Sequence, residues 1–360
     1  MAKLAGRMGA SPSVVEEWER TGLITLAKAE SLAKKTHTPV GYLFLKEPPQ
    51  EVLPIKDFRT IGDSATPVTP NLLDIIYESQ RRQEWYREHL IETGTPPLAF
   101  VGKITPDTPV DKAALEICKT FKIGALLSTV SADWQANLLL HIEALEEGGV
   151  LVMRSGVVGY TRQLSVEDFR GFALCDAYAP VVFINNRDSK AAQLFTLVHE
   201  LVHIWIGESA VSNLDRTYAP SQRIESYCNA VAAEILLPLS EMIVRWVPES
   251  NEDLQIQQFS ARYKVSTLVV LRRARDAGFL TQSDFRARYG AECARLRGLN
   301  KIKRGNFYNT MNARVSGRIA RAIVASTLEG RTLYRDAMSL LGVKSAVVFQ
   351  KFAQKIGYSI

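Results

Sequence analysis

The chain has 360 residues, of which 46% are hydrophobic and 23% are charged, and its formal net charge is +6. This length suggests two or three domains with ample core, and the composition is that of an ordinary soluble globular protein. No run approaches the ~18 continuous apolar residues of a membrane helix. Residues 1–7 lack the apolar core of a secretory signal. We therefore expect a cytoplasmic protein with no membrane partner.

The four cysteines support a reducing compartment. They show no paired spacing of the kind that predicts a disulfide framework or a metal cluster, and they are Cys118, Cys175, Cys228 and Cys293. We expect buried thiols.

Residues 1–48 predict a helix-turn-helix module. Helices are expected over 2–8, 12–20 and 26–35, with Ser11 and Thr25 as N-caps and Gly22 as a stop signal. Residues 14–20, Val-Val-Glu-Glu-Trp-Glu-Arg, resemble the recognition helix of Xre-type DNA-binding regulators. The resemblance implies that Ser13, Val14 and Glu17 face the major groove of DNA.

Two observations oppose DNA binding by this module. The first helix of the Xre-type fold would precede residue 1. The candidate recognition helix also carries Glu16, Glu17 and Glu19 against a single Arg20, which is a poor match for a polyanion. A relic that docks protein is the alternative.

Residues 49–94 predict a connector followed by one amphipathic helix. Prolines at positions 48, 49, 54, 67 and 70 favour extended chain, and apolar residues recur at helical spacing over 71–92. Gly94-Thr-Pro-Pro97 ends the helix and indicates a domain boundary.

His199-Glu-Leu-Val-His203 is the most specific motif in the chain. Two of only five histidines stand one helical turn apart, so their rings can bind one Zn²⁺ from the same helix face. Glu200 lies beside them, where it can take a proton from the zinc-bound water. The segment before the motif predicts a strand over 178–185, a turn, and a helix that starts near Ser189.

A catalytic zinc site needs a third protein ligand, which we expect from a second helix over 223–238. Glu225 is the favoured ligand, and Asn229, one turn later, can hold a ligand histidine through its second ring nitrogen. Two alternatives remain. The helix dipole alone favours a glutamate in the first turn. Glu234 is the rival ligand, and it points about 180° away from Glu225 at ~100° per residue.

Three segments together resemble the ImmA/IrrE family of zinc metallo-endopeptidases: Phe195-Thr-Leu-Val-His-Glu-Leu-Val-His203, Glu225-x-x-x-Asn229 and Ala232-Ala-Glu-Ile-Leu-Leu-Pro238. The similarity extends over roughly residues 95 to 245. It implies a compact zincin in which His199, His203 and Glu225 bind zinc and Glu200 is the general base. The chain departs from the family pattern at three positions. The family usually has Glu where Tyr227 stands, Ala where Cys228 stands and Phe where Val231 stands.

The C-terminal part is strongly basic. Residues 251–360 hold 20 Lys and Arg against 7 Asp and Glu, a net of +13, which leaves −7 for residues 1–250. A second helix-turn-helix is expected over 259–277, with Ser266 as an N-cap. Arg272, Arg273 and Arg275 on it are candidate DNA contacts. An acidic protein substrate, or no ligand at all, are the alternatives for this surface. Further helices are expected over 304–328, 332–341 and 345–356.

These observations predict a mainly α, α+β protein. The expected parts are an all-α helix-turn-helix module over 1–48, a linker and amphipathic helix over 49–94, a zincin-like peptidase domain with a small β-sheet over 95–248, and a basic helical domain over 249–360.

The favoured function is a zinc-dependent endopeptidase with one Zn²⁺ per chain that acts in transcriptional control. The family resemblance implies a helix-turn-helix repressor as the protein substrate. The alternative is a DNA-binding regulator or antitoxin whose zinc is structural or senses a ligand, without turnover. Candidates for stabilising the oxyanion are Tyr218, Tyr227 and His141, with no spacing to choose among them.

Overall fold

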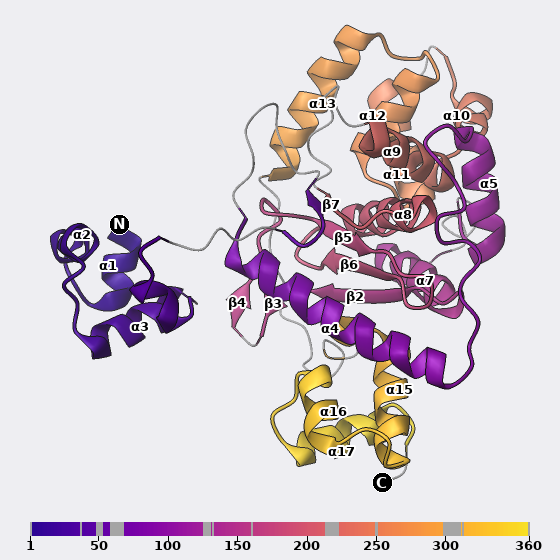
Figure 1. The fold of residues 1–360 in the computed structure, drawn as a ribbon. Coiled ribbons are helices and arrows are strands. Elements are labelled where there is room, and N and C mark those ends of the chain that lie inside the picture. The colour runs from indigo at the N-terminus through magenta and orange to yellow at the C-terminus, as the bar shows by residue number, and fades with distance from the viewer. Residues whose placement is uncertain are drawn as a thin grey trace. The chain divides into compact units, whose positions relative to one another are not determined.

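The computed structural model describes the chain over 2–36, 38–47, 53–57, 68–124, 131, 133–159, 161–212, 223–248, 251–297, 311 and 313–358. The chain divides into two compact units, Met1–Pro54 and Ile55–Ile360, which are described separately (Figure 1).

The first unit consists of short helices. They are α1 Ala2–Met8, α2 Pro12–Thr21, α3 Leu26–Thr36 and the 3₁₀ helix η1 Val40–Phe44. Gly22 adopts the left-handed conformation (φ 67°) and ends α2, as predicted. Ser11 occupies the N-cap position, but its hydroxyl bonds to the Ser13 hydroxyl and not to a backbone N–H of α2. Ser13 and Glu17 are exposed. Contact of this helix with DNA stays a prediction.

The second unit is built on a five-stranded mixed sheet of order β1-β7-β5-β6-β2, beside a small β3-β4 hairpin. The strands are β1 Lys56–Asp57, β2 Leu151–Ser155, β3 Val157–Val158, β4 Arg162–Gln163, β5 Gly171–Leu174, β6 Val181–Asn185 and β7 Ala210–Ser212. Strand β2 runs parallel to β6, and β5 runs antiparallel to both β6 and β7. Every residue of β6 is buried, so both faces of the sheet are covered there.

The described helices of this unit surround the sheet (Figure 1). They are α4 Pro70–Glu92, α5 Val110–Phe121, α7 Trp134–Glu147, α8 Lys190–Ile206, α9 Arg223–Leu236, α10 Leu239–Arg245, α11 Glu252–Tyr263, α12 Thr267–Asp276, α13 Gln282–Arg297, α15 Gly317–Leu328, α16 Tyr334–Leu341 and α17 Ala346–Lys355. Helix α8 packs on β5 and β6, and both α7 and α9 pack on α8. The predicted fold class, mainly α with a small sheet, is confirmed.

One hydrophobic core crosses the boundary that we predicted at residue 248. Val182 and Ile184 of β6 and Leu201 of α8 share a single buried cluster with Phe259 of α11 and Phe285 of α13. Helices α11 to α13 therefore complete the core around α8 and α9. The sequence predicted one helix over 304–328, but in the structure the helix α15 begins only at Gly317. Ser316, immediately before it, adopts a left-handed φ of 74° and interrupts the helix. Residues 301–310 lie outside the described part.

No single described helix is both long and apolar enough to cross a membrane. The bent pair α9 and α10 meets the length and composition test. The apolar residues of α9 are nevertheless buried against α8 and α5, as expected of a core helix.

Candidate metal centre

Helix α8 carries the histidine motif through the core. Ser189 accepts a hydrogen bond from the backbone N–H of Ala192 at 3.2 Å and so caps its N-terminus, as predicted. Gly207 (φ 85°) ends the helix in the left-handed conformation. His199, Glu200 and His203 are fully buried. Burial of three ionisable side chains on one helix is costly unless they have a joint partner.

The two histidines meet Glu225 of α9 at one point. The Nε2 atoms of His199 and His203 are 3.2 Å apart, and the Glu225 carboxylate lies 2.9 Å from His203 Nε2 and 3.3 Å from His199 Nε2. Ligands about 2.05 Å from a tetrahedral zinc ion are separated by about 3.3 Å. The three side chains are thus spaced like three corners of a zinc coordination tetrahedron, and this donor set fits the metal.

The protonation states also suit metal ligands. Burial lowers the pKa of His203, against the opposing effect of Glu225, and so favours the neutral imidazole. Burial opposes ionisation of Glu225, but the two imidazoles outweigh burial and hold the pKa of that carboxyl far below its usual range. A metal binds neutral imidazole and ionised carboxylate.

The rival ligand Glu234 lies at the other end of α9. Its carboxylate forms an ion pair with Arg273 of α12, whose Nε also donates to the Leu237 carbonyl at 2.9 Å. Arg273 is 5% exposed. The prediction that Arg273 contacts DNA is therefore wrong: its guanidinium is buried because it holds the end of α9.

Gly171 of β5 lies close to the site, but the sequence analysis assigned it no role. A Cβ atom at this position would stand 2.4 Å from Thr196 Cγ2, 2.8 Å from the Phe183 carbonyl oxygen and 3.2 Å from Glu200 Oε1. Only glycine lets β5 approach α8 this closely. The glycine at the start of a buried strand was the available signal, and it brings backbone beside the candidate base.

The remaining predicted site residues lie at different places relative to the metal ligands. Asn229 lies one turn after Glu225 and is partly buried, but within the described part of the chain its Oδ1 has no hydrogen-bond partner. Its bond to a ligand histidine stays a prediction. Tyr227, two residues after Glu225, points about 200° away around α9. His141 is on α7, where its Nδ1 bonds to the Asn137 carbonyl at 2.8 Å. Tyr218 lies outside the described residues.

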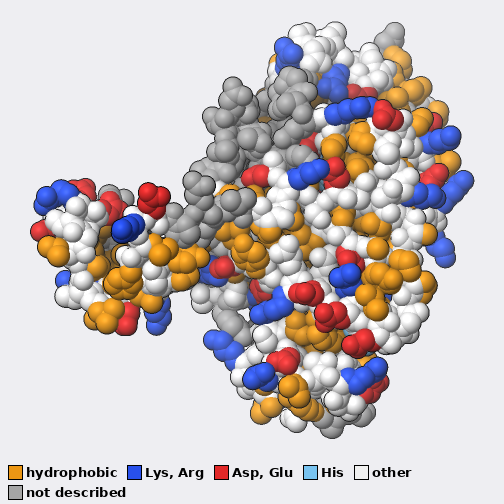
Figure 2. Space-filling view, viewed as in Figure 1, with side chains coloured by type: hydrophobic (Ala, Val, Ile, Leu, Met, Phe, Trp, Pro, Cys, Tyr) orange, Lys and Arg blue, Asp and Glu red, His pale blue; other side chains and the backbone are white. Residues whose placement is uncertain are grey.

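Of the other two arginines that we predicted to contact DNA, Arg275 takes part in contacts within the fold. Arg275 pairs with Asp276 at 2.6 Å, and its guanidinium lies 4.7 Å from the Phe285 ring centroid. Arg272 is half-buried. Over the face of the second unit seen in Figure 2, basic and acidic side chains are interspersed. Nucleic-acid binding by Arg272 and Arg275 stays a prediction.

The four cysteines all lie in the described part and form no disulfide. Cys228 is buried next to the site, and burial raises the pKa of its thiol well above the usual value. This thiol therefore stays protonated and packs as a small apolar group.

Comparisons with known families agree with this geometry. Residues 148–275 match the peptidase family model described as IrrE N-terminal-like domain, Peptidase_M78. Residues 315–355 match a domain of unknown function, DUF8813. The comparison with curated proteins gives no match. The matched segment 148–275 contains the motif helix α8, the ligand helix α9 and the buttressing helix α12, and it crosses the boundary predicted at 248. The chain therefore carries a peptidase domain of the ImmA/IrrE family, and the site just described lies within it.

Proposed function

We propose that this protein is a zinc-dependent endopeptidase. The observation that carries the proposal is the convergence of His199, His203 and Glu225, whose ligand atoms all lie within 4.8 Å of one another in a buried group. Zinc, when bound there, supplies a Lewis acid that acidifies water and polarises a carbonyl group. Membership of the domain in a peptidase family supports hydrolysis of a peptide bond.

Glu200 is the proposed general base. It follows the ligand His199 directly on α8 and is fully buried, so its carboxylate lies in surroundings of low dielectric. There it takes the proton of the attacking water and returns it to the leaving amine. The close approach of β5 at Gly171 limits the positions open to the Glu200 side chain.

Glu200→Gln tests this role because it keeps the shape of the side chain and removes its basicity. We expect the purified variant to bind one equivalent of zinc, measured by elemental mass spectrometry, while peptide hydrolysis falls by at least about 100-fold. Glu88→Gln, on the exposed face of α4, is the matched control and should keep full activity. Undiminished hydrolysis by the Glu200 variant would refute the mechanism.

The proposed substrate is a helix-turn-helix repressor, and its cleavage would relieve transcriptional repression. Similarity to the ImmA/IrrE family supports this choice. The test incubates the zinc-loaded full chain with the repressor encoded beside its own gene and maps the products by mass spectrometry. A single cut that requires Glu200 supports the substrate class.

The alternative is a regulator whose metal is structural and which has no turnover. The same pair of variants separates the two. If wild type and Glu200→Gln bind zinc and DNA equally and neither cleaves any repressor, the regulator is favoured.

A further inference from the structure

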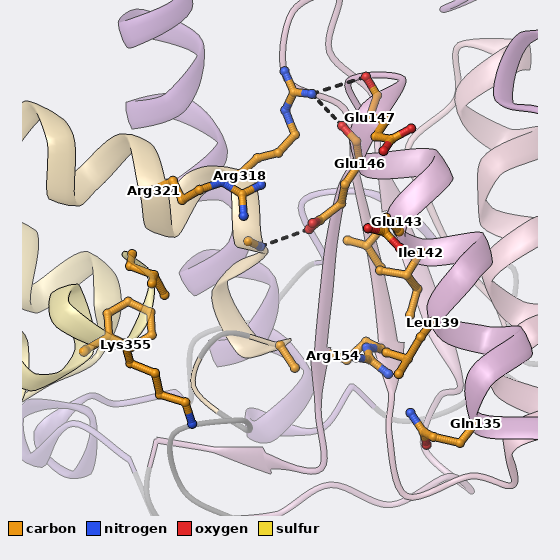
Figure 3. A pocket seen from close by; sticks show the side chains of 15 residues that line it. Gln135, Leu139, Ile142, Glu143, Glu146, Glu147, Arg154, Arg318, Arg321 and Lys355 are labelled. Carbon is orange, nitrogen blue, oxygen red and sulfur yellow. Dashed lines mark hydrogen bonds between the residues drawn. The ribbon is translucent and has the colours of Figure 1, made fainter. Parts of the chain in front are cut away.

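A cavity whose lining includes none of the metal ligands lies between the peptidase core and the C-terminal helices (Figure 3). Its volume is about 760 Å³, within the range of small-molecule sites. Helix α7 and strand β2 form one wall, and α15 and α17 form the other. The second wall belongs to the segment that matches the domain of unknown function.

Arg154 of β2 is the unusual residue in this cavity. Its side chain is mostly buried, which lowers its pKa. Among the described residues its guanidinium makes no hydrogen bond and no ion pair within 4.0 Å. A second cation, Lys190, is near enough that Arg154 contributes, after burial, to lowering the pKa of Lys190. An unpaired guanidinium held in a cavity beside a like charge costs stability unless something neutralises it.

The carboxylate whose charge acts on Arg154, that of Glu146, is already engaged. Glu146 of α7 accepts hydrogen bonds from the Ser316 hydroxyl at 2.6 Å and from the Gly317 N–H at 3.0 Å. These bonds hold the left-handed Ser316 at the start of α15. Arg318 is engaged as well, because it donates to the Glu146 carbonyl at 2.5 Å (Figure 3). Both residues fasten α15 to α7. The charge of Glu146 raises the pKa of Arg154 against burial, but the hydrogen bonds of its carboxylate go to Ser316 and Gly317 and not to the Arg154 guanidinium.

Further cations face Arg154 across the cavity. Arg321 of α15 and Lys355 of α17 line the opposite wall (Figure 3). Apolar side chains also line the cavity, among them Ile142, Val152 and Phe352. Glu143 and Glu147 also line the cavity, and both are exposed. A ligand with a negatively charged group and an apolar body matches this combination.

We propose that this cavity binds a small organic anion, a carboxylate or a phosphate ester, whose charged group pairs with Arg154. The ligand then bridges β2 to Arg321 of α15 and joins the C-terminal helices to the peptidase domain. Charge-assisted hydrogen bonds to a guanidinium are favoured for both anion types.

Calorimetric titration of the full chain with citrate, ATP and inorganic phosphate tests the site. We expect citrate or ATP to bind more tightly than inorganic phosphate, and which of the two binds identifies the anion as carboxylate or phosphate ester. In Arg154→Met the affinity should fall at least about tenfold. Without ligand, this variant should unfold at the same temperature as wild type or higher, because a buried unpaired charge is removed. A purely structural arginine would lower that temperature.

Arg335→Met on α16 is the matched control, because it removes one positive charge from the same segment outside the cavity, and its affinity should equal that of wild type. Arg321→Met provides a second, exposed test position and should also weaken binding. Hydrogen exchange should show ligand protection of β2, α7 and α15. The proposal is overturned if none of the three anions binds at about 1 mM. It is equally overturned if inorganic phosphate binds as tightly as the organic anions, or if Arg154→Met binds as wild type does.

Discussion

The two ends of helix α9 carry glutamates with opposite surroundings. Glu225, in the first turn, lies against two imidazoles whose Nε2 atoms are 3.3 Å and 2.9 Å from its carboxylate. Glu234, nine residues later, pairs with the guanidinium of Arg273 from α12. At one end the polar atoms need an added cation, and at the other the charge is neutralised by the protein itself. A glutamate inside a protein therefore indicates a metal site only when no lysine or arginine side chain already neutralises its charge.

The largest effect should follow a change at the metal end. Glu225→Gln removes the anionic ligand, and we expect zinc affinity to fall by more than about 100-fold, because even residues that only support a ligand cost 10- to 100-fold. Competition with a chromogenic chelator measures the affinity. Glu234→Gln, on the same helix, should keep the affinity of wild type. An equal loss of zinc affinity in both variants would mean that Glu225 is no more a metal ligand than Glu234 is.

The next effect concerns the other end of α9. Arg273→Met leaves the half-buried Glu234 without its cation and removes a buried guanidinium that holds the end of α9, so we expect the free energy of unfolding to fall by about 3–5 kcal/mol in urea titrations. The double variant Glu234→Met, Arg273→Met should recover much of this loss, because it removes both charges. If the double variant is no more stable than the single one, packing and not charge dominates this contact.

A third change acts beside Glu200 without touching a ligand. Gly171→Ala places a methyl group into Thr196 and the Phe183 carbonyl, and we expect about 1–3 kcal/mol of destabilisation with a fall in peptide hydrolysis. Zinc stoichiometry should stay at one. Gly290→Ala in α13, where a Cβ meets nothing within 4 Å, is the control and should be neutral or stabilising. Full activity of the Gly171 variant would show that β5 does not restrain Glu200.

The smallest effect is expected next to Arg273. Arg272 is half-buried, and Arg272→Gln should change the free energy of unfolding by less than about 0.5 kcal/mol. If α12 contacts DNA, the same variant should reduce the salt dependence of DNA binding by about one ion, measured by fluorescence anisotropy. A loss of stability close to that of Arg273→Met would instead make Arg272 a structural residue.

Local pattern was sufficient for much of the fold and for half of the site. Helical spacing placed His199 and His203 on one face of α8, and the cap signals at Ser189 and Ser266 marked helix starts that the structure confirms. The left-handed stop at Gly22 was equally visible in the sequence. These features depend on interactions within a few residues, which a sequence displays directly.

The break before α15 was not visible in the sequence. Ser316 is a non-glycine residue in the left-handed region, and it is held there by Glu146, which is 170 residues away. A helical pattern of apolar residues continues through such a position. The core that α11 to α13 share with α8 and α9 was equally hidden, because its members are far apart in the sequence.

The sequence alone determined which functional groups the two helices carry. One helix has two imidazoles and a carboxylate, and the second has two glutamates on opposite faces. Only the tertiary structure decided which glutamate meets the histidines, because that depends on how α9 is rotated against α8 and α12. It also decided that Arg273 is internal and paired with Glu234, whereas the Arg154 guanidinium lines a cavity and makes no hydrogen bond to the described residues. Charge counts along a chain cannot distinguish these, since the energy of a charged group depends on what surrounds it in space.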